Sequence, residues 1–163
     1  YSLFDLKLNN GLGAVTQQNI SLFAKSTERI TANGQFLIAH EYGNNTFRAY
    51  RITPNGIGNP VFSSIGSDHD QAIQQNGEGY MKLGPRDNLA VPISNPGISN
   101  RVELFTLDTA GRVTNLRNID LNEPNGQIYG VEFSPAGNKL FATVKVNSGS
   151  SHLFEYFLDS LNR

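Results

Sequence analysis

The chain has 163 residues, 13 Lys and Arg against 14 Asp and Glu, and a formal net charge of −1. Without a concentrated basic stripe it lacks the means to neutralise phosphates, which argues against nucleic acid, and no apolar run reaches the roughly 20 residues that span a bilayer. The absence of cysteine excludes disulfides and thiolate metal sites, whereas a hydrophobic content of 38%, with 10 Phe and 6 Tyr, indicates a folded chain.

An apolar-aromatic strand recurs four times along the chain. The copies are predicted at residues 2–8, 47–52, 102–107 and 153–158. Their matching aromatics stand 46 to 55 residues apart and are Phe4, Tyr50, Phe105 and Tyr156. A glycine follows the first three copies, as Gly11, Gly56 and Gly111. Repeats of this length that are filled with strands are typical of stacked sheet modules such as β-propeller blades.

Four blade-like units follow one another without a visible linker. We place them at about residues 1–24, 25–66, 77–122 and 126–163, with two, four, four and three strands in turn. The incomplete units at the two ends do not complement each other, because both contain the aromatic third strand. The fold class predicted is therefore all-β, a partial β-propeller of about three and a half four-stranded blades, and residues 1–163 form one segment of a larger ring. Because the chain starts in a strand at Tyr1 without an initiator Met, we expect a piece of a longer precursor.

Alternation within the runs indicates which strands are inside. Leu140, Ala142 and Val144 share one face of the strand that begins at Lys139. The run from Leu153 to Leu158 is apolar on both faces, which is typical of a strand packed between two sheets. We expect the four matching aromatics to pack between neighbouring blades rather than to line an exposed groove.

The segment Tyr129–Phe141 (YGVEFSPAGNKLF) resembles a familiar propeller opening. With residues 11–16, 38–47, 49–50 and 79–82, it makes nearly the whole chain similar to the WD-repeat-like propeller region of large exported surface proteins of Bacteroidota, the gliding-adhesin type that uses type IX secretion. The turn at residues 84–88 departs from the pattern because it lacks the expected glycine.

The resemblance implies an extracellular or cell-surface location and a non-enzymatic role as a rigid platform for binding or display, related to adhesion. The implied partners are the remainder of the parent propeller or another copy of the chain, together with a glycan or a surface protein. No cofactor is expected. Two triplets fit the O-glycosylation pattern of that bacterial group, at Thr109 and at Ser160.

Loops rich in polar residues supply the candidate binding residues, because loops carry function on a rigid scaffold. They are His40, Glu41, Asn44, Asn45, Asp68, His69 and Asp70. The acidic residues around His69 suit a cation, although adjacent side chains of an extended loop rarely converge, and a solvated loop is the simpler interpretation. His40 with Glu41 suits either an acid–base pair or a turn.

No catalytic residue and no metal site is assigned, because the chain lacks a Gly-x-Ser-x-Gly motif and a phosphate-binding loop followed by a helix. The alternative to a binding platform is a propeller hydrolase of lactonase-like type. It requires His40, Glu41, Asp68 or His69 to converge on one central cavity.

Overall fold

The computed structural model describes residues 1–70, 76–95, 99–123, 125–146 and 149–159. Within these ranges the chain forms thirteen strands in four antiparallel sheets and no α-helix, and a short 3-10 turn, η1 (Asn9–Gly11), lies between the first two strands. The all-β fold class predicted from the repeats is confirmed, and the sheets contain two, four, four and three strands, as the unit pattern predicts. No helix in the described ranges has the length and hydrophobicity needed to cross a membrane.

The strands follow the chain from sheet to sheet. The first sheet holds β1 (Leu3–Asp5) and β2 (Ala14–Gln17). The second holds β3 (Ser26–Ala32), β4 (Phe36–Glu41), β5 (Thr46–Thr53) and β6 (Gly56–Ser64). The third holds β7 (Lys82–Leu83), β8 (Asn88–Asn95), β9 (Ser99–Leu107) and β10 (Val113–Asp120). The fourth holds β11 (Gly126–Phe133), β12 (Lys139–Val146) and β13 (Ser151–Phe157).

Short polar turns hold each sheet in a meander, in which consecutive strands pair with one another. The Asn33 side-chain oxygen accepts the backbone N–H groups of Gln35 and Phe36 at 2.9 and 2.8 Å, which closes the β3–β4 turn. The Asp108 carboxylate accepts the N–H groups of Ala110 and Arg112 at 2.9 and 2.7 Å in the β9–β10 turn. Such side chains satisfy turn donors that have no strand partner, so the predicted turn chemistry fixes the strand order.

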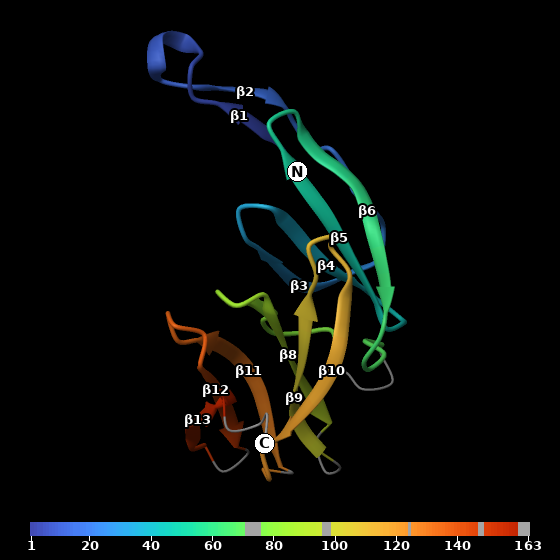
Figure 1. The fold of residues 1–163 in the computed structure, drawn as a ribbon, viewed down its shortest axis with the longest axis vertical. Helices are drawn as coiled ribbons and strands as arrows, with labels where there is room; N and C mark the ends of the chain where they lie inside the picture. Colours follow the sequence, from blue (N-terminus) through green and yellow to red (C-terminus); the bar gives the residue numbers. More distant parts are fainter. Residues whose placement is uncertain (71–75, 96–98, 124, 147–148, 160–163) are drawn as a thin grey trace.

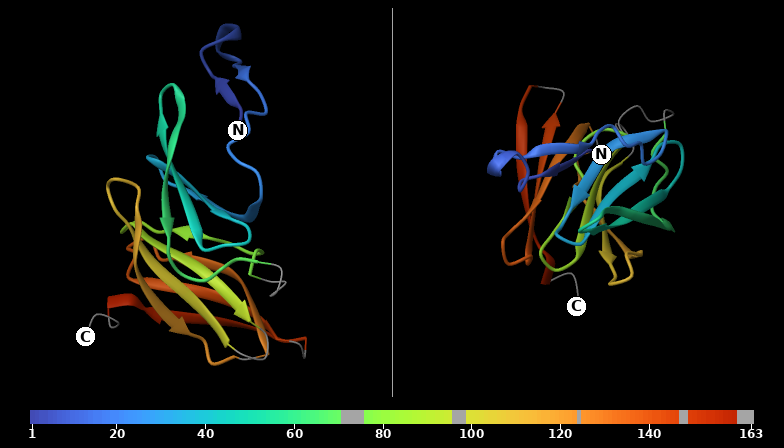
Figure 2. Two further views of the ribbon diagram at one scale, coloured as in Figure 1. Left: turned by 90° about the vertical axis from the view of Figure 1, so that its right-hand side faces the viewer. Right: turned by 90° about the horizontal axis from the view of Figure 1, so that it is seen from above.

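The third sheet lies between the second and the fourth (Figures 1 and 2). Along β8, Leu89, Val91 and Ile93 pack in a cluster with Phe36 and Phe47 of the second sheet, and all three are at most 2% exposed. The intervening residues of the third sheet turn the other way, and their cluster joins the fourth sheet through Leu140, Ala142 and Val144. The core is thus two apolar layers on either side of one sheet, which is how neighbouring propeller blades bury each other.

The end sheets depart from the predicted packing. Tyr50 and Phe105 are 2% and 1% exposed, as expected for aromatics between sheets, and Tyr156 is half-buried against the fourth-sheet cluster. Phe4 is 57% exposed, so the prediction that it packs between blades is wrong; its ring lies over Gly13 within its own hairpin. Leu153 and Phe157 are also exposed, so β13 has one covered face instead of two. In both cases no further sheet covers the outward face within the described residues.

Candidate functional site

The loop end of the second sheet gathers the predicted binding residues. His40 and Glu41 end β4, Asn44 and Asn45 form the β4–β5 turn, and the segment at residues 65–70 follows β6. Backbone hydrogen bonds join the two loops: Gly43 N–H donates to the His69 carbonyl at 2.8 Å, and His69 N–H donates to the Asn44 carbonyl at 2.9 Å. Residues separated by more than twenty positions therefore form one rim, which we call the loop rim (residues 40–45 and 65–70).

Two histidines of this rim are buried. The rings of His40 and His69 stack with centroids 3.6 Å apart and 17° between their planes, and both side chains are at most 1% exposed. His40 Nδ1 lies 2.6 Å from the Glu41 carbonyl oxygen. Because a carbonyl can only accept, Nδ1 carries the proton of the neutral ring, and the buried Nε2 is an acceptor for which the described part of the chain supplies no donor. His69, which the sequence suggested would be solvated, is instead interior.

Burial keeps both imidazoles neutral. Desolvation lowers the pKa of His40 from 6.5 to about 4, and Arg29 adds to the decrease. Desolvation, followed by repulsion from a protonated His40 and from Arg29, lowers the pKa of His69 to about 2. Protonating either ring would place a cation against the other, in a region without solvent. At neutral pH the pair is therefore a packing element without charge.

Glu41 is engaged by its neighbours. The Asn44 amide donates to it at 2.7 Å, and Arg48 Nε donates at 2.5 Å. These partners, led by the Asn44 hydrogen bond, hold the pKa of the Glu41 carboxyl below its usual value. The Arg48 guanidinium also lies over the Phe23 and Phe62 rings, at 4.4 and 4.9 Å from their centroids. Glu41 thus orients Arg48 and is not free to act as a general base.

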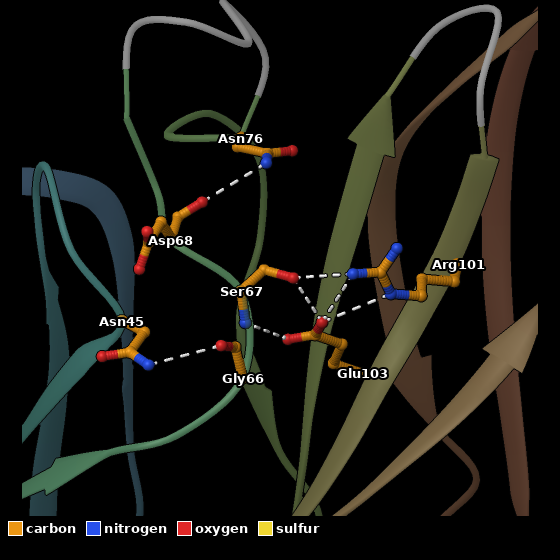
Figure 3. Close-up of polar contacts among 7 residues, drawn as sticks. All are labelled: Asn45, Gly66, Ser67, Asp68, Asn76, Arg101 and Glu103. Carbon is orange, nitrogen blue, oxygen red and sulfur yellow. Dashed lines mark hydrogen bonds and ion pairs between the residues drawn. The ribbon is translucent and has the colours of Figure 1, made fainter.

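A buried carboxylate connects the loop rim to the third sheet (Figure 3). Glu103 of β9, only 2% exposed, accepts the Ser67 backbone N–H at 3.1 Å and the Ser67 hydroxyl at 2.6 Å. Arg101 donates to both Glu103 and Ser67, at 3.0 and 2.7 Å. A buried charge is tolerated when several donors surround it, so this network fixes the segment at residues 65–70 against its neighbour sheet.

Arg29 holds the other side of the site. Its guanidinium, which is 1% exposed, donates from Nε to the Asn76 carbonyl at 3.2 Å and from Nη1 to the Tyr80 carbonyl at 2.9 Å. Burial lowers its pKa to about 10, so it remains charged at neutral pH. The segment at residues 76–80 is thereby pinned to β3.

Between these anchored segments lies an open groove of about 450 Å³, which we call the rim groove. Three carboxylates, three hydroxyl side chains and a glycine line it, from Ser26, Thr27, Glu28, Tyr42, Asp70, Gly77 and Glu78. Among the residues that the structure describes, the buried Tyr42 hydroxyl has no hydrogen-bond partner. Of the seven predicted binding residues, only Asp70 lines the groove; Asn44, Asn45 and Asp68 help to build the rim beside it.

The hydrolase alternative is met only in part by this geometry. His40 and His69 converge, but their burial leaves no path for a substrate, and Glu41 is held by Arg48. Among the described residues no group of three or more His, Asp and Glu is placed to hold a metal ion. Thr109 is exposed in the β9–β10 turn, and Ser160 lies outside the described residues.

Sequence reasoning missed the residues that anchor the site. Arg29 stands between Thr27 and Thr31 on the inward face of β3, and Glu103 shares a face with Phe105 and Leu107. A charged residue at an inward position of an alternating strand is a signal for a buried polar network, and it was available in both strands. Glu28 and Glu78 carry no such signal, because residues that are distant in sequence meet at the groove only after folding.

No family model matches the chain, and no curated protein matches it. Among solved structures, it is similar to a provisionally assigned 6-phosphogluconolactonase of Bacteroides fragilis, with 15% identity and a TM-score of 0.46 over 78% of this chain and 37% of that one. It is also similar to the hydrazine synthase of Kuenenia stuttgartiensis, with 15% identity and a TM-score of 0.40 over 88% of this chain and 49% of that one. The chain thus spans less than half the length of either protein.

Proposed function

We propose that the chain is a non-enzymatic platform that displays the rim groove and binds a glycan bearing amino groups at an extracellular or cell-surface site. The carrying observation is the groove lining, in which Glu28, Asp70 and Glu78 stand among Ser26, Thr27 and Tyr42. Carboxylates accept hydrogen bonds from pairs of sugar hydroxyls and attract an ammonium group, whereas hydroxyl side chains both donate and accept.

The Tyr42 ring supports this proposal. It lines the groove beside Gly77, where an added Cβ would lie 3.7 Å from ring carbon Cδ2. An aromatic ring with a polar tip suits the mixed polar and apolar faces of a sugar.

Rigidity supports the display role. Arg29 and Glu103 fix the segments on either side of the groove through hydrogen bonds to backbone and side-chain groups. A site whose walls are already ordered loses less conformational entropy on binding. The protein would therefore contribute shape and charge to a bound ligand and no bond making or breaking.

The test is a titration of the purified chain with glucosamine oligomers, followed by calorimetry, with N-acetylated and neutral glucan oligomers as comparators. We expect saturable binding of the amino form that weakens with added salt, and a loss of roughly tenfold or more in affinity for Glu28→Gln combined with Glu78→Gln. Asp120→Asn, an exposed carboxylate on β10, is the matched control and should bind normally. The proposal would be contradicted if the double variant bound the amino oligomer as tightly as the unaltered chain does, or if no oligomer bound.

A further inference from the structure

Two exposed tyrosines lie next to each other beside the first strands of the sheets. Tyr80, just before β7, and Tyr129 of β11 are 58% and 49% exposed. Their ring centroids lie 5.6 Å apart, with 49° between the ring planes. Aromatic side chains carry a large apolar surface that folding or binding normally covers. An exposed pair of rings held this close is therefore a candidate surface for a ligand.

Hydrogen bonds fix the backbone of Tyr80 on two sides. Its N–H donates to the Tyr129 carbonyl at 3.0 Å, and its own carbonyl accepts Arg29 Nη1 at 2.9 Å. Gly79 has a φ of +91° and packs so closely that an added Cβ would lie 3.1 Å from the Tyr129 carbonyl oxygen. Because strands β3 and β11 both hold this segment, a ligand that stacks on the exposed ring orders little backbone.

Tyr80 also lines a second groove, of about 380 Å³, which we call the tyrosine groove. Its walls are β3 on one side and the segment at residues 79–82 on the other, and its lining includes Glu28, Ile30, Thr31, Gly79, Tyr80 and Lys82. Among the described residues that line it, only Glu28 and Lys82 are charged, and the Lys82 ammonium lies 2.7 Å from the Glu132 carboxylate. Ile30, which is 60% exposed, adds apolar surface. The tyrosine groove therefore offers mainly apolar contact and little net charge.

Glu28 belongs to both grooves. It lines the rim groove and the tyrosine groove, and its carboxylate accepts the Gly79 N–H at 3.5 Å. The two grooves also share their walls, since β3 continues along one side and residues 77–82 along the other. The seven residues of β3 extend roughly 20 Å at about 3.3 Å per residue. The joined grooves thus have room for several rings of a linear chain.

We propose that the rim groove and the tyrosine groove form one continuous site for a linear glycan, in which an amino sugar occupies the rim groove and a later ring of the same chain stacks on Tyr80. This inference rests on the proposed function, because the rim groove selects the glycan. The apolar C–H face of a sugar ring suits an aromatic side chain, and the low net charge of the tyrosine groove makes no demand for an amino group there. Tyr80 therefore makes the affinity depend on the length of the glycan.

Calorimetric titrations with the glucosamine disaccharide and hexamer test this extension. The disaccharide occupies the rim groove, whereas the hexamer also reaches Tyr80. We expect Tyr80→Ala to weaken hexamer binding by about 3- to 10-fold and to change the disaccharide affinity by less than about twofold. Comparing variants on one oligomer removes the gain that a longer chain has from its extra binding registers. Tyr80→Phe keeps the ring and should bind the hexamer normally.

Phe4→Ala is the matched control. Phe4 is 57% exposed, on the β1–β2 hairpin that projects from the far end of the molecule (Figure 1), so its loss should change neither affinity. The double variant Glu28→Gln and Glu78→Gln should lose affinity for both oligomers, because it alters the rim groove itself. Tyr80 is exposed, so an unchanged melting curve of Tyr80→Ala would show that the variant remains folded.

Three outcomes would overturn the inference and leave the proposed function standing. They are hexamer binding by Tyr80→Ala as tight as that of the unaltered chain, an equal loss for the disaccharide and the hexamer, and a loss in Tyr80→Phe as large as that in Tyr80→Ala. If neither oligomer binds the unaltered chain, the inference and the proposed function both fail.

Discussion

The two layers on either side of the third sheet bury similar apolar side chains but treat polar groups differently. The layer toward the second sheet includes His40, His69, Arg29 and Glu103, all at most 2% exposed. The layer toward the fourth sheet is mainly aliphatic, and its buried polar residues Ser94 and Asn100 bind backbone groups of β11 and the turn before it. Among the described residues, similar packing thus coexists with buried ionisable groups in one layer and none of comparable burial in the other.

This difference separates two sources of stability. The aliphatic layer depends on removal of apolar surface from water, which changes little with pH. The layer with the histidines also depends on the protonation of its side chains, because a buried imidazole resists gaining a proton. The predictions below use substitution and pH to distinguish the two layers.

The largest expected effect is a cavity in the aliphatic layer. Leu140 is fully buried between the third and fourth sheets, so Leu140→Ala should lower the free energy of unfolding by about 3–5 kcal/mol. Denaturant unfolding at pH 7 and 5.5 measures it, and the loss should be the same at both pH values. A loss that changes strongly with pH would contradict the separation of the layers.

The next effect is the acid sensitivity of the layer with the histidines. Both folded pKa values lie below 6.5, so the unfolded chain gains protons first, and the stabilisation present above pH 6.5 is lost as the pH falls. Between pH 7 and 5.5 the two histidines together should remove about 2–3 kcal/mol from the free energy of unfolding. Denaturant unfolding at several pH values measures the slope.

His40→Gln combined with His69→Gln is the matching variant for that slope. It should flatten the pH dependence between 7 and 5.5 even if it lowers stability at every pH. A stability of the unaltered chain that stays constant over this window would show that the buried pair gains no proton on unfolding.

The smallest effect concerns the glycine turns. Gly111→Ala strains a backbone at φ +88° and displaces the Phe36 ring, so we expect a cost of about 1–2 kcal/mol. Gly11→Ala shares the strain but meets nothing, so it should cost less. Thermal melts of dilute samples compare the two variants. Equal decreases in melting temperature would mean that displacing the Phe36 ring adds nothing to the cost of the strained backbone.

The fold was readable from the sequence because its signals are local. The matching aromatics, the Asn33-Gly34 and Asp108–Gly111 turns, and the alternation along β12 each report on strands that pair within one sheet. Period and turn chemistry therefore predicted how many strands each unit contributes. The same logic failed at Phe4 and Phe157, because a pattern shows which face is apolar but not whether another sheet covers it.

The candidate site was less predictable because it is assembled from distant segments. Its loops are brought together by hydrogen bonds such as that from Gly43 to His69, and the groove needs Glu28 of β3 together with Glu78 of the segment between β6 and β7. The polar character of the rim was visible in the sequence. The stacking of His40 on His69 was not visible in the sequence, since each residue taken alone is equally typical of a solvated loop.

The arrangement of the sheets also has a consequence for how such a chain changes over evolutionary time. The main contacts between sheets join neighbours in the sequence, β3 with β7 and β11 with β7, β8 and β9. A gene duplication or deletion that adds or removes one whole unit therefore leaves the contacts of more distant units intact. Selection can therefore change the loops of one unit while the contacts among the other units stay the same.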